Sequence, residues 1–169
     1  PISYTYGDAQ IYENEIDYLI EVDEPLQSRE SSAPSAEAQE IGSRIAHMVH
    51  DSSTLQSGIG AIPDAVLAGL NHRKGLRIWT EMFSDGVLDL YKAGALDKEI
   101  PLTASFLFGS EELYEWLNLN RSVRMLRTEK TNDPGESGAR RCNVHALDFT
   151  RRSALASDGP GKEPVKQIG

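Results

Sequence analysis

Between residues 53 and 126 the chain alternates short apolar runs with segments of helical period, and this alternation constrains its fold more than any other feature. The predicted strands are residues 53–57, 76–83, 100–108 and 123–126. The predicted helices between them are residues 63–70, 84–91 and 111–119. Strands that alternate with helices this regularly favour right-handed crossovers and a parallel sheet. We therefore expect an α/β fold, with a mainly parallel sheet and helices on both faces.

The segments that flank this pattern suggest three regions. Residues 16–22 partly alternate in polarity and predict a strand, and residues 27–35 are a polar linker. From Ala36 to about His50, apolar residues recur at intervals of three and four, as in an amphipathic helix. Beyond Pro134 no period persists, and residues 135–169 predict loop or disorder. The predicted regions are residues 1–30, 31–134 and 135–169.

Composition excludes several classes of function. The net charge of −9 leaves no cationic face for nucleic acid. Apolar runs are far shorter than the ~18 residues of a membrane span, which predicts an intracellular protein without a membrane segment. The single cysteine, Cys142, fits a reducing compartment. The histidines lack partners at metal-ligand spacing, so we expect no metal site.

Two loops follow predicted strands at the edge where open parallel sheets bind ligands. The first runs from Gln56 to Pro63 and contains Gly58 and Gly60. Its glycines let backbone N–H groups approach a ligand closely, and the following helix N-terminus adds positive potential, so the loop could hold a phosphate or an oxyanion. A plain connection between strand and helix is the alternative.

The second loop contains Glu81, which follows an apolar strand and lies beside Trp79, Met82 and Phe83 in the sequence. Partial desolvation by such neighbours would raise both the basicity and the nucleophilicity of its carboxylate. Alternatively, the side chain faces solvent or pairs with Arg77 or Arg73. Chemistry alone leaves both interpretations open.

Taken together, these segments resemble the acetyl-CoA hydrolase and transferase family, most closely its 4-hydroxybutyrate CoA-transferase branch. The resemblance is carried by the run STLQSGIGAIPDAVL at residues 53–67, by TEMFSDGV at 80–87, and by TASF at 103–106 with GSEELY at 109–114. The segment IDYLIEVDEPL at 16–26 is similar to the end of the family's first domain. The resemblance covers about residues 4–134.

The resemblance implies a function for both loops. The active-site glutamate of the family falls on Glu81, which would attack an acyl-CoA thioester and form a glutamyl-CoA thioester before an acceptor carboxylate takes the CoA. Gln56, Gly58, Ile59 and Gly60 are the expected CoA- and oxyanion-binding residues. The implied ligands are a short-chain acyl-CoA and a carboxylate, with coenzyme A as a substrate and no bound metal or redox cofactor. A homo-oligomer in the cytoplasm, or in the mitochondrial matrix of a eukaryote, is also implied.

The resemblance further implies how the chain is divided. Residues 1–30 would end an N-terminal CoA-transferase domain, and residues 31–134 would begin the C-terminal acetyl-CoA hydrolase/transferase domain. The family's later glycine-rich CoA-binding segment has no counterpart after Pro134. We hypothesise that the chain is a fragment with a frameshifted, truncated or foreign tail. An acyl-CoA hydrolase and a non-catalytic interaction fragment are the alternative functions.

Overall fold

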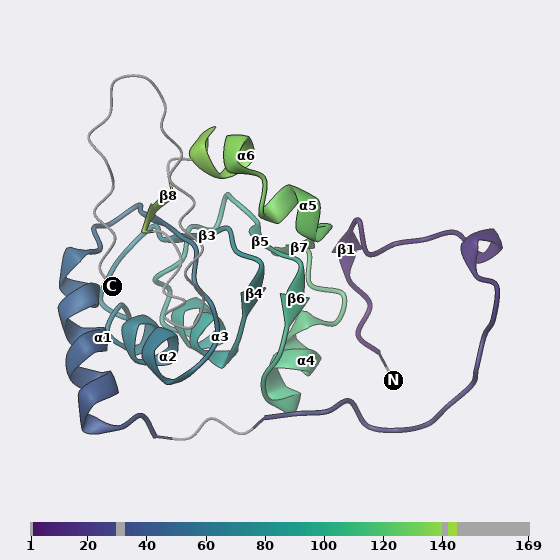
Figure 1. Ribbon diagram of the computed structural model, residues 1–169, viewed down its shortest axis with the longest axis horizontal. Coiled ribbons are helices and arrows are strands. Elements are labelled where there is room, and N and C mark those ends of the chain that lie inside the picture. The colour runs from purple at the N-terminus through teal and green to yellow at the C-terminus, as the bar shows by residue number, and fades with distance from the viewer. Residues whose placement is uncertain (1, 30–32, 140–141, 145–169) are drawn as a thin grey trace.

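The computed structural model describes residues 2–29, 33–139 and 142–144 (Figure 1). A short 3-10 helix, η1, spans Glu13–Glu15. The helices are α1 Ala36–Met48, α2 Ala61–Ala68, α3 Asp85–Lys92, α4 Glu111–Leu117, α5 Thr128–Thr131 and α6 Pro134–Ala139. The strands are β1 Tyr6–Gly7, β2 Thr54–Leu55, β3 Arg77–Ile78, β4 Met82–Phe83, β5 Leu102–Ala104, β6 Phe106–Leu107, β7 Val123–Met125 and β8 Cys142–Val144.

All strand pairs in the described residues are parallel. Strand β2 lies between β8 and β3, and β7 lies between β5 and β1. An isolated parallel bridge between Trp79 and Thr103 joins the two groups, so the strand order is β8-β2-β3-β5-β7-β1. The predicted α/β fold with a parallel sheet is therefore confirmed.

Helices α2, α3 and α4 connect β2, β3, β5 and β7 in chain order. Each connection moves one position in the same direction across the sheet, so right-handed crossovers place these three helices on one face. Between them and the sheet lies a continuous apolar core, in which Leu70, Leu76, Phe83 and Leu113 are each fully buried. The core thus fixes the carboxyl ends of the strands relative to the helices that follow.

Helix α1 begins at its predicted residue, because Ser35 caps it by accepting a hydrogen bond from the amide of Ala38 at 3.2 Å. Its buried Gly42 faces α2 so closely that an added Cβ would lie 2.6 Å from the Cβ of Ala65. A glycine is therefore required where the two helices cross.

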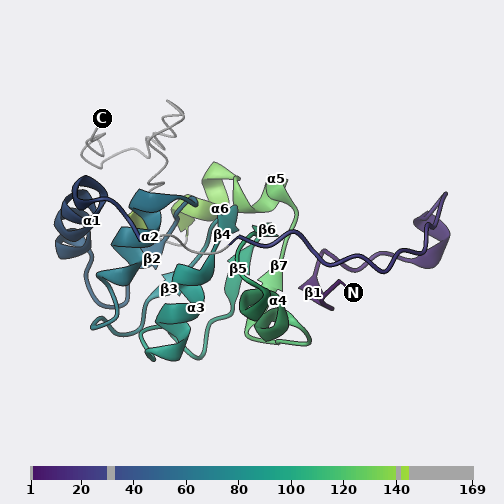
Figure 2. The same cartoon turned by 90° about the horizontal axis from the view of Figure 1, so that it is seen from below.

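The strand predicted at residues 16–22 is wrong. These residues form no strand, and the side chains of Tyr18, Leu19 and Ile20 are at least 80% exposed. Residues 11–26 run as an extended arm that leaves the sheet beyond β1 (Figures 1 and 2). Alternating polarity alone makes no strand, since strand hydrogen bonds need a neighbouring edge.

Two predicted strands prove to be interrupted. Residues 76–83 form β3 and β4, separated at Thr80 and Glu81, and residues 100–108 form β5 and β6, separated at Ser105. The register is the same on both sides of the interruption, because Trp79 pairs with Thr103 and Met82 with Phe106. The interruption is a local irregularity between two long neighbouring strands.

The two ends of the described chain also contribute secondary structure. Strand β1 pairs with β7, so residues 6–7 extend the sheet of the region predicted at 31–134. Helix α6 and strand β8 lie within the stretch predicted as loop or disorder, and residues 145–169 are outside the described residues. Among the residues that the structure describes, no helix has the length and apolar character of a membrane span.

Candidate functional site

The carboxyl edge of the parallel sheet brings the predicted site segments together. The Gln56–Gly60 loop follows β2, Glu81 follows β3, and Ser105 follows β5. Because these strands are parallel and adjacent, the three segments lie side by side. The sheet therefore places the predicted nucleophile next to the predicted glycine loop.

Glu81 lies at the interruption between β3 and β4. Its backbone carbonyl accepts hydrogen bonds from two consecutive amides, those of Ser105 and Phe106, each at 2.9 Å. Two donors on one carbonyl hold the backbone of Glu81 firmly against the neighbouring strand. The carboxylate is nevertheless available, because the residue that carries it is exposed.

This exposure corrects the expectation that apolar neighbours partly desolvate Glu81. Trp79 and Phe83 are buried, whereas Glu81 between them is exposed. In a regular strand these three residues would share one face, but the interruption at Thr80 and Glu81 breaks this alternation. The alternative pairing with Arg77 is absent, since Arg77 binds Asp97 at 3.0 Å and, within the described ranges, Glu81 has no ion pair.

The glycine loop presents backbone donors beside Glu81. Gln56, Gly58, Ile59 and Gly60 are half-buried, and Gly60 has a φ of 128°, which only glycine adopts freely. In the described part of the chain, the amides of residues 58–60 donate no hydrogen bond to other protein groups. These N–H groups are the ones that could stabilise an oxyanion.

Thr80 connects the two loops. It is completely buried, and its hydroxyl donates a hydrogen bond to the backbone carbonyl of Ser57 in the glycine loop. Its amide donates to the carbonyl of Thr103 at 3.0 Å. The residue that precedes Glu81 is therefore bonded to the glycine loop on one side and to β5 on the other.

A second set of contacts supports the site from beyond β7. The indole Nε1 of Trp79 donates to the carbonyl of Thr131 at 3.1 Å, and the hydroxyls of Thr131 and Ser105 lie 2.7 Å apart. Thr131 is fully buried. Helix α5 is thus attached to the strands that carry Glu81 and Ser105.

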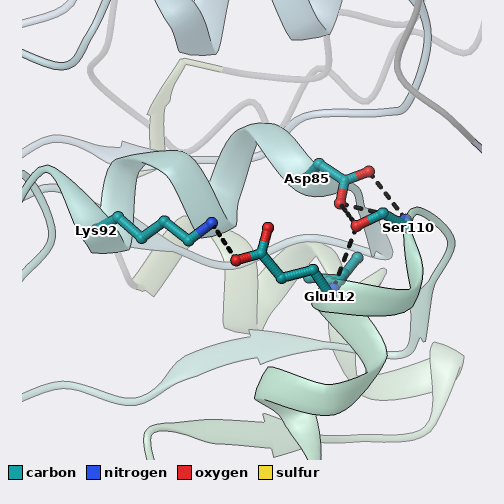
Figure 3. Close-up of polar contacts among 5 residues, drawn as sticks. Asp85, Lys92, Ser110 and Glu112 are labelled. Atoms are coloured by element: carbon teal, nitrogen blue, oxygen red, sulfur yellow. Dashed lines mark hydrogen bonds and ion pairs between the residues drawn. The ribbon is translucent and has the colours of Figure 1, made fainter.

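The N-termini of α2, α3 and α4 meet at the same edge. The hydroxyl of Ser84 donates to Asp64 of α2 at 2.8 Å. Figure 3 shows the carboxylate of Asp85 accepting from the hydroxyl of Ser110 at 2.5 Å, and Lys92 pairing with Glu112 at 2.6 Å. Carboxylates at these helix starts are favoured by the helix dipole, and they fix the helices relative to one another.

Two of the cavities in the described part of the chain lie away from Glu81. A groove of about 360 Å³ lies between α1 and α2 and is lined by His47, His72 and Arg73 among others. A smaller one of about 130 Å³ lies beside Asp64 and Asp85. No group of three metal-ligating side chains occurs in the part of the chain described here.

Sequence reasoning missed Thr80, Ser105 and Thr131 as parts of this site. Thr80 and Ser105 lie inside the motif segments TEMFSDGV and TASF, next to or across from the glutamate. Their position in these motif segments could have indicated that Thr80 and Ser105 belong to the site. No local pattern marked Thr131, whose role depends on α5 returning to the sheet.

Known proteins are similar to this chain in sequence and in fold. The 4-hydroxybutyrate coenzyme A transferase of Clostridium kluyveri is 38% identical over 136 residues, which are 77% of this chain and 32% of that protein. The solved structure of a 4-hydroxybutyrate CoA-transferase from Porphyromonas gingivalis matches with a TM-score of 0.72 and 35% identity, over 80% of this chain and 36% of that one. The matched segment is therefore similar to the family of coenzyme A transferases and acetyl-CoA hydrolases.

The hydrolase side of this family also appears among the relatives. The acetyl-CoA hydrolase of Kluyveromyces lactis is 53% identical over 45 residues, 25% of this chain and 9% of that protein. No protein-family model matches the chain. The chain spans about a third of the length of the first curated relatives it matches.

Proposed function

We propose that this chain carries part of a coenzyme A transferase, with Glu81 as the nucleophile. The observation that carries the proposal is the position of Glu81: its carboxylate is exposed at the carboxyl edge of the sheet, while its backbone is fixed beside a loop with three amides that donate no hydrogen bond within the described residues. The relatives named as CoA transferases support the reaction class.

The proposed reaction begins when a Glu81 carboxylate oxygen attacks the thioester carbon of an acyl-CoA. The C–S bond breaks, which gives an acyl-glutamyl anhydride and CoA thiolate. The thiolate then attacks the Glu81 carbonyl of the anhydride, releasing the first carboxylate and leaving a glutamyl-CoA thioester. An acceptor carboxylate reverses both steps and leaves as the new acyl-CoA.

Each step passes through a tetrahedral oxyanion, and the amides of Gly58, Ile59 and Gly60 are the proposed donors to it. Gln56 is proposed to contact the CoA. Coenzyme A enters as a substrate in this scheme rather than as a resident cofactor. A short-chain acyl group, a homo-oligomer and a cytoplasmic or mitochondrial-matrix location complete the proposal.

We further propose that residues outside the described segment cover Glu81. An exposed carboxylate is well solvated and therefore a weak nucleophile, and closure of a site strengthens its electrostatic interactions. The curated relatives are about three times as long as the segment they share with this chain. In this proposal residues 1–30 end one domain of such a protein and residues 31–134 begin the next.

The intact mass of the protein after incubation with acetyl-CoA tests the proposed nucleophile. A gain of one CoA minus one water is expected for the parent chain. Glu81→Gln should reduce the rate of this gain by at least about 1,000-fold, because an amide cannot act as the nucleophile. Glu115→Gln, which changes an exposed glutamate on α4, is the matched control and should react like the parent.

An adduct of equal amount on Glu81→Gln would remove Glu81 from the mechanism. No adduct on any variant would contradict transferase activity in this chain and favour a non-catalytic fragment. Thioester consumption with and without added acetate separates the two enzymatic alternatives: a transferase requires the acceptor, whereas a hydrolase of the kind named among the relatives consumes acetyl-CoA without it.

A further inference from the structure

We infer that Thr80 is a positioning residue, whose hydroxyl holds the Gln56–Gly60 loop at the distance from Glu81 that the reaction needs. The inference rests on the proposed function for its catalytic consequence. The structural part, that one side chain ties the two loops together, stands on the contacts of Thr80 alone.

The first step is the burial of Thr80. Its exposed fraction is 0%, although it lies directly before the exposed Glu81. A buried hydroxyl must find partners inside the protein, because an unmade hydrogen bond there costs free energy. The hydroxyl of Thr80 finds one on the carbonyl of Ser57, with the carbonyl of Met82 at 3.2 Å as a further neighbour.

The second step concerns the polar groups of the loop before α2, since the carbonyl of Gly60 already accepts from the amide of Asp64 at 3.0 Å. Within the ranges that the structure describes, the amides of residues 58–60 donate no hydrogen bond, and the buried hydroxyl of Ser57 has no partner. The side chain that reaches the loop from β3 is therefore that of Thr80. Its bond to Ser57 lies one residue before Gly58, the first proposed oxyanion donor.

The third step is rigidity on the other side. The amide of Thr80 bonds to Thr103, and the carbonyl of Glu81 holds the amides of Ser105 and Phe106. Hydrogen bonds thus hold the backbone of Thr80 and Glu81 against the neighbouring strand. The hydroxyl of Thr80 then holds the loop in place relative to both residues. A misplacement of about 1 Å between nucleophile and donors can cost about 100-fold in rate.

Thr80→Val tests the inference, because valine has the shape of threonine without the hydroxyl. Thr80→Ser keeps the hydroxyl and should behave like the parent. Thr103→Val is the matched control, because it makes the same change at a buried threonine on β5. The hydroxyl of Thr103 donates to the carbonyl of Pro101 at 3.4 Å and does not contact the loop.

The first readout is the amide order parameter of residues 58–60 by NMR relaxation, which needs no activity. We expect values near the rigid range of about 0.85 in the parent, in Thr80→Ser and in Thr103→Val, and values below about 0.6 in Thr80→Val. Unchanged order parameters in Thr80→Val would overturn the inference, whatever the reaction proves to be.

The second readout is the rate of the CoA adduct as a function of acetyl-CoA concentration. Thr80→Val should lower the maximal rate by about 10- to 100-fold and leave the half-saturating concentration within about twofold of the parent's. A mobile loop together with a parental adduct rate would overturn the positioning role. If the parent forms no adduct, the proposed function fails, and the order parameters still decide whether Thr80 holds the loop.

Discussion

At the scale of single residues, short polar contacts stabilise the amino end of β3, at the edge of the sheet opposite the site. Asp97 shows how they work. Its carboxylate accepts from the amide of Glu99 at 2.9 Å and from Arg77 at 3.0 Å. The Glu99 amide, with Arg77 beside it, holds the pKa of Asp97 below its ordinary value of 3.8. The negative charge of Asp97 therefore stabilises the fold.

The sign of this effect sets a pH dependence. Since the pKa is lower in the folded state, the stabilisation is complete above about pH 4 and is lost as the pH falls through the folded-state pKa. Asp97→Asn should lower the free energy of unfolding by about 1 kcal/mol at pH 7. Urea unfolding at several pH values should show that the difference from the parent shrinks below about pH 4.

A matched comparison for Asp97 is the exposed pair of Glu40 and Arg44, whose side chains are 63% and 78% exposed. Glu40→Gln should change stability by less than about 0.5 kcal/mol at any pH, because water screens such pairs. An equal loss of unfolding free energy in both variants would mean that the hydrogen bonds of Asp97 stabilise the fold no more than an exposed ion pair does.

At the scale of elements, the crossing of α1 and α2 shows how one missing side chain sets a helix position. An added Cβ on Gly42 would lie 2.8 Å from the backbone carbon of Ala65 as well as close to its Cβ. Backbone atoms cannot rotate away as a flexible side chain can, so α1 would have to move from α2.

Gly42→Ala should therefore destabilise the protein by about 1–3 kcal/mol, even though alanine is the better helix former. Ser43→Ala, at the exposed neighbouring position, isolates helix propensity and should be neutral or slightly stabilising. Thermal unfolding of both variants measures the difference. A stabilised Gly42→Ala variant would show that the helices can separate without cost.

The interruption of two neighbouring strands is the other feature at this scale. The strands predicted at residues 76–83 and 100–108 both form in the predicted place. Each is interrupted where the carbonyl of Glu81 accepts from the amides of Ser105 and Phe106. Irregular ladders of this kind often lie next to active sites, where they redirect a side chain. Apolar periodicity could not reveal it, because the residues on both sides remain strand-like.

At the scale of the whole molecule, the described chain combines a compact sheet with an extended arm. Strand β1 is held at the sheet edge by its pairing with β7 and by the ion pair of Asp8 with Lys130 at 2.8 Å. Residues 11–26 then leave the sheet (Figure 2). Many of their apolar side chains are exposed.

Limited proteolysis should follow this division. A low concentration of chymotrypsin should cut the arm first, after Tyr12, Tyr18 or Leu19, because exposed backbone without strand hydrogen bonds fits a protease site. The sheet between β2 and β7 should resist under the same conditions. Mass spectrometry of the first fragments checks the order, and initial cuts between residues 54 and 125 would contradict it.

The sequence alone determined the elements and their class. Serines precede α1 and α4 and cap them through their hydroxyls, and the parallel sheet follows from the alternation of strands and helices. It also indicated Glu81 and the glycine loop, through their place after strands. These features depend on neighbours in the chain, which periodicity and capping report directly.

Only the tertiary structure decided how those elements meet. The bond from Thr80 to Ser57, the exposure of Glu81 and the pairing of β1 with β7 each depend on groups that are far apart in the sequence. Residues 16–22 have a strand-like pattern but form no strand, because no neighbouring strand edge in the described chain pairs with them. Hydrogen bonds between strands and burial are set by partners in space, and a local pattern does not identify those partners.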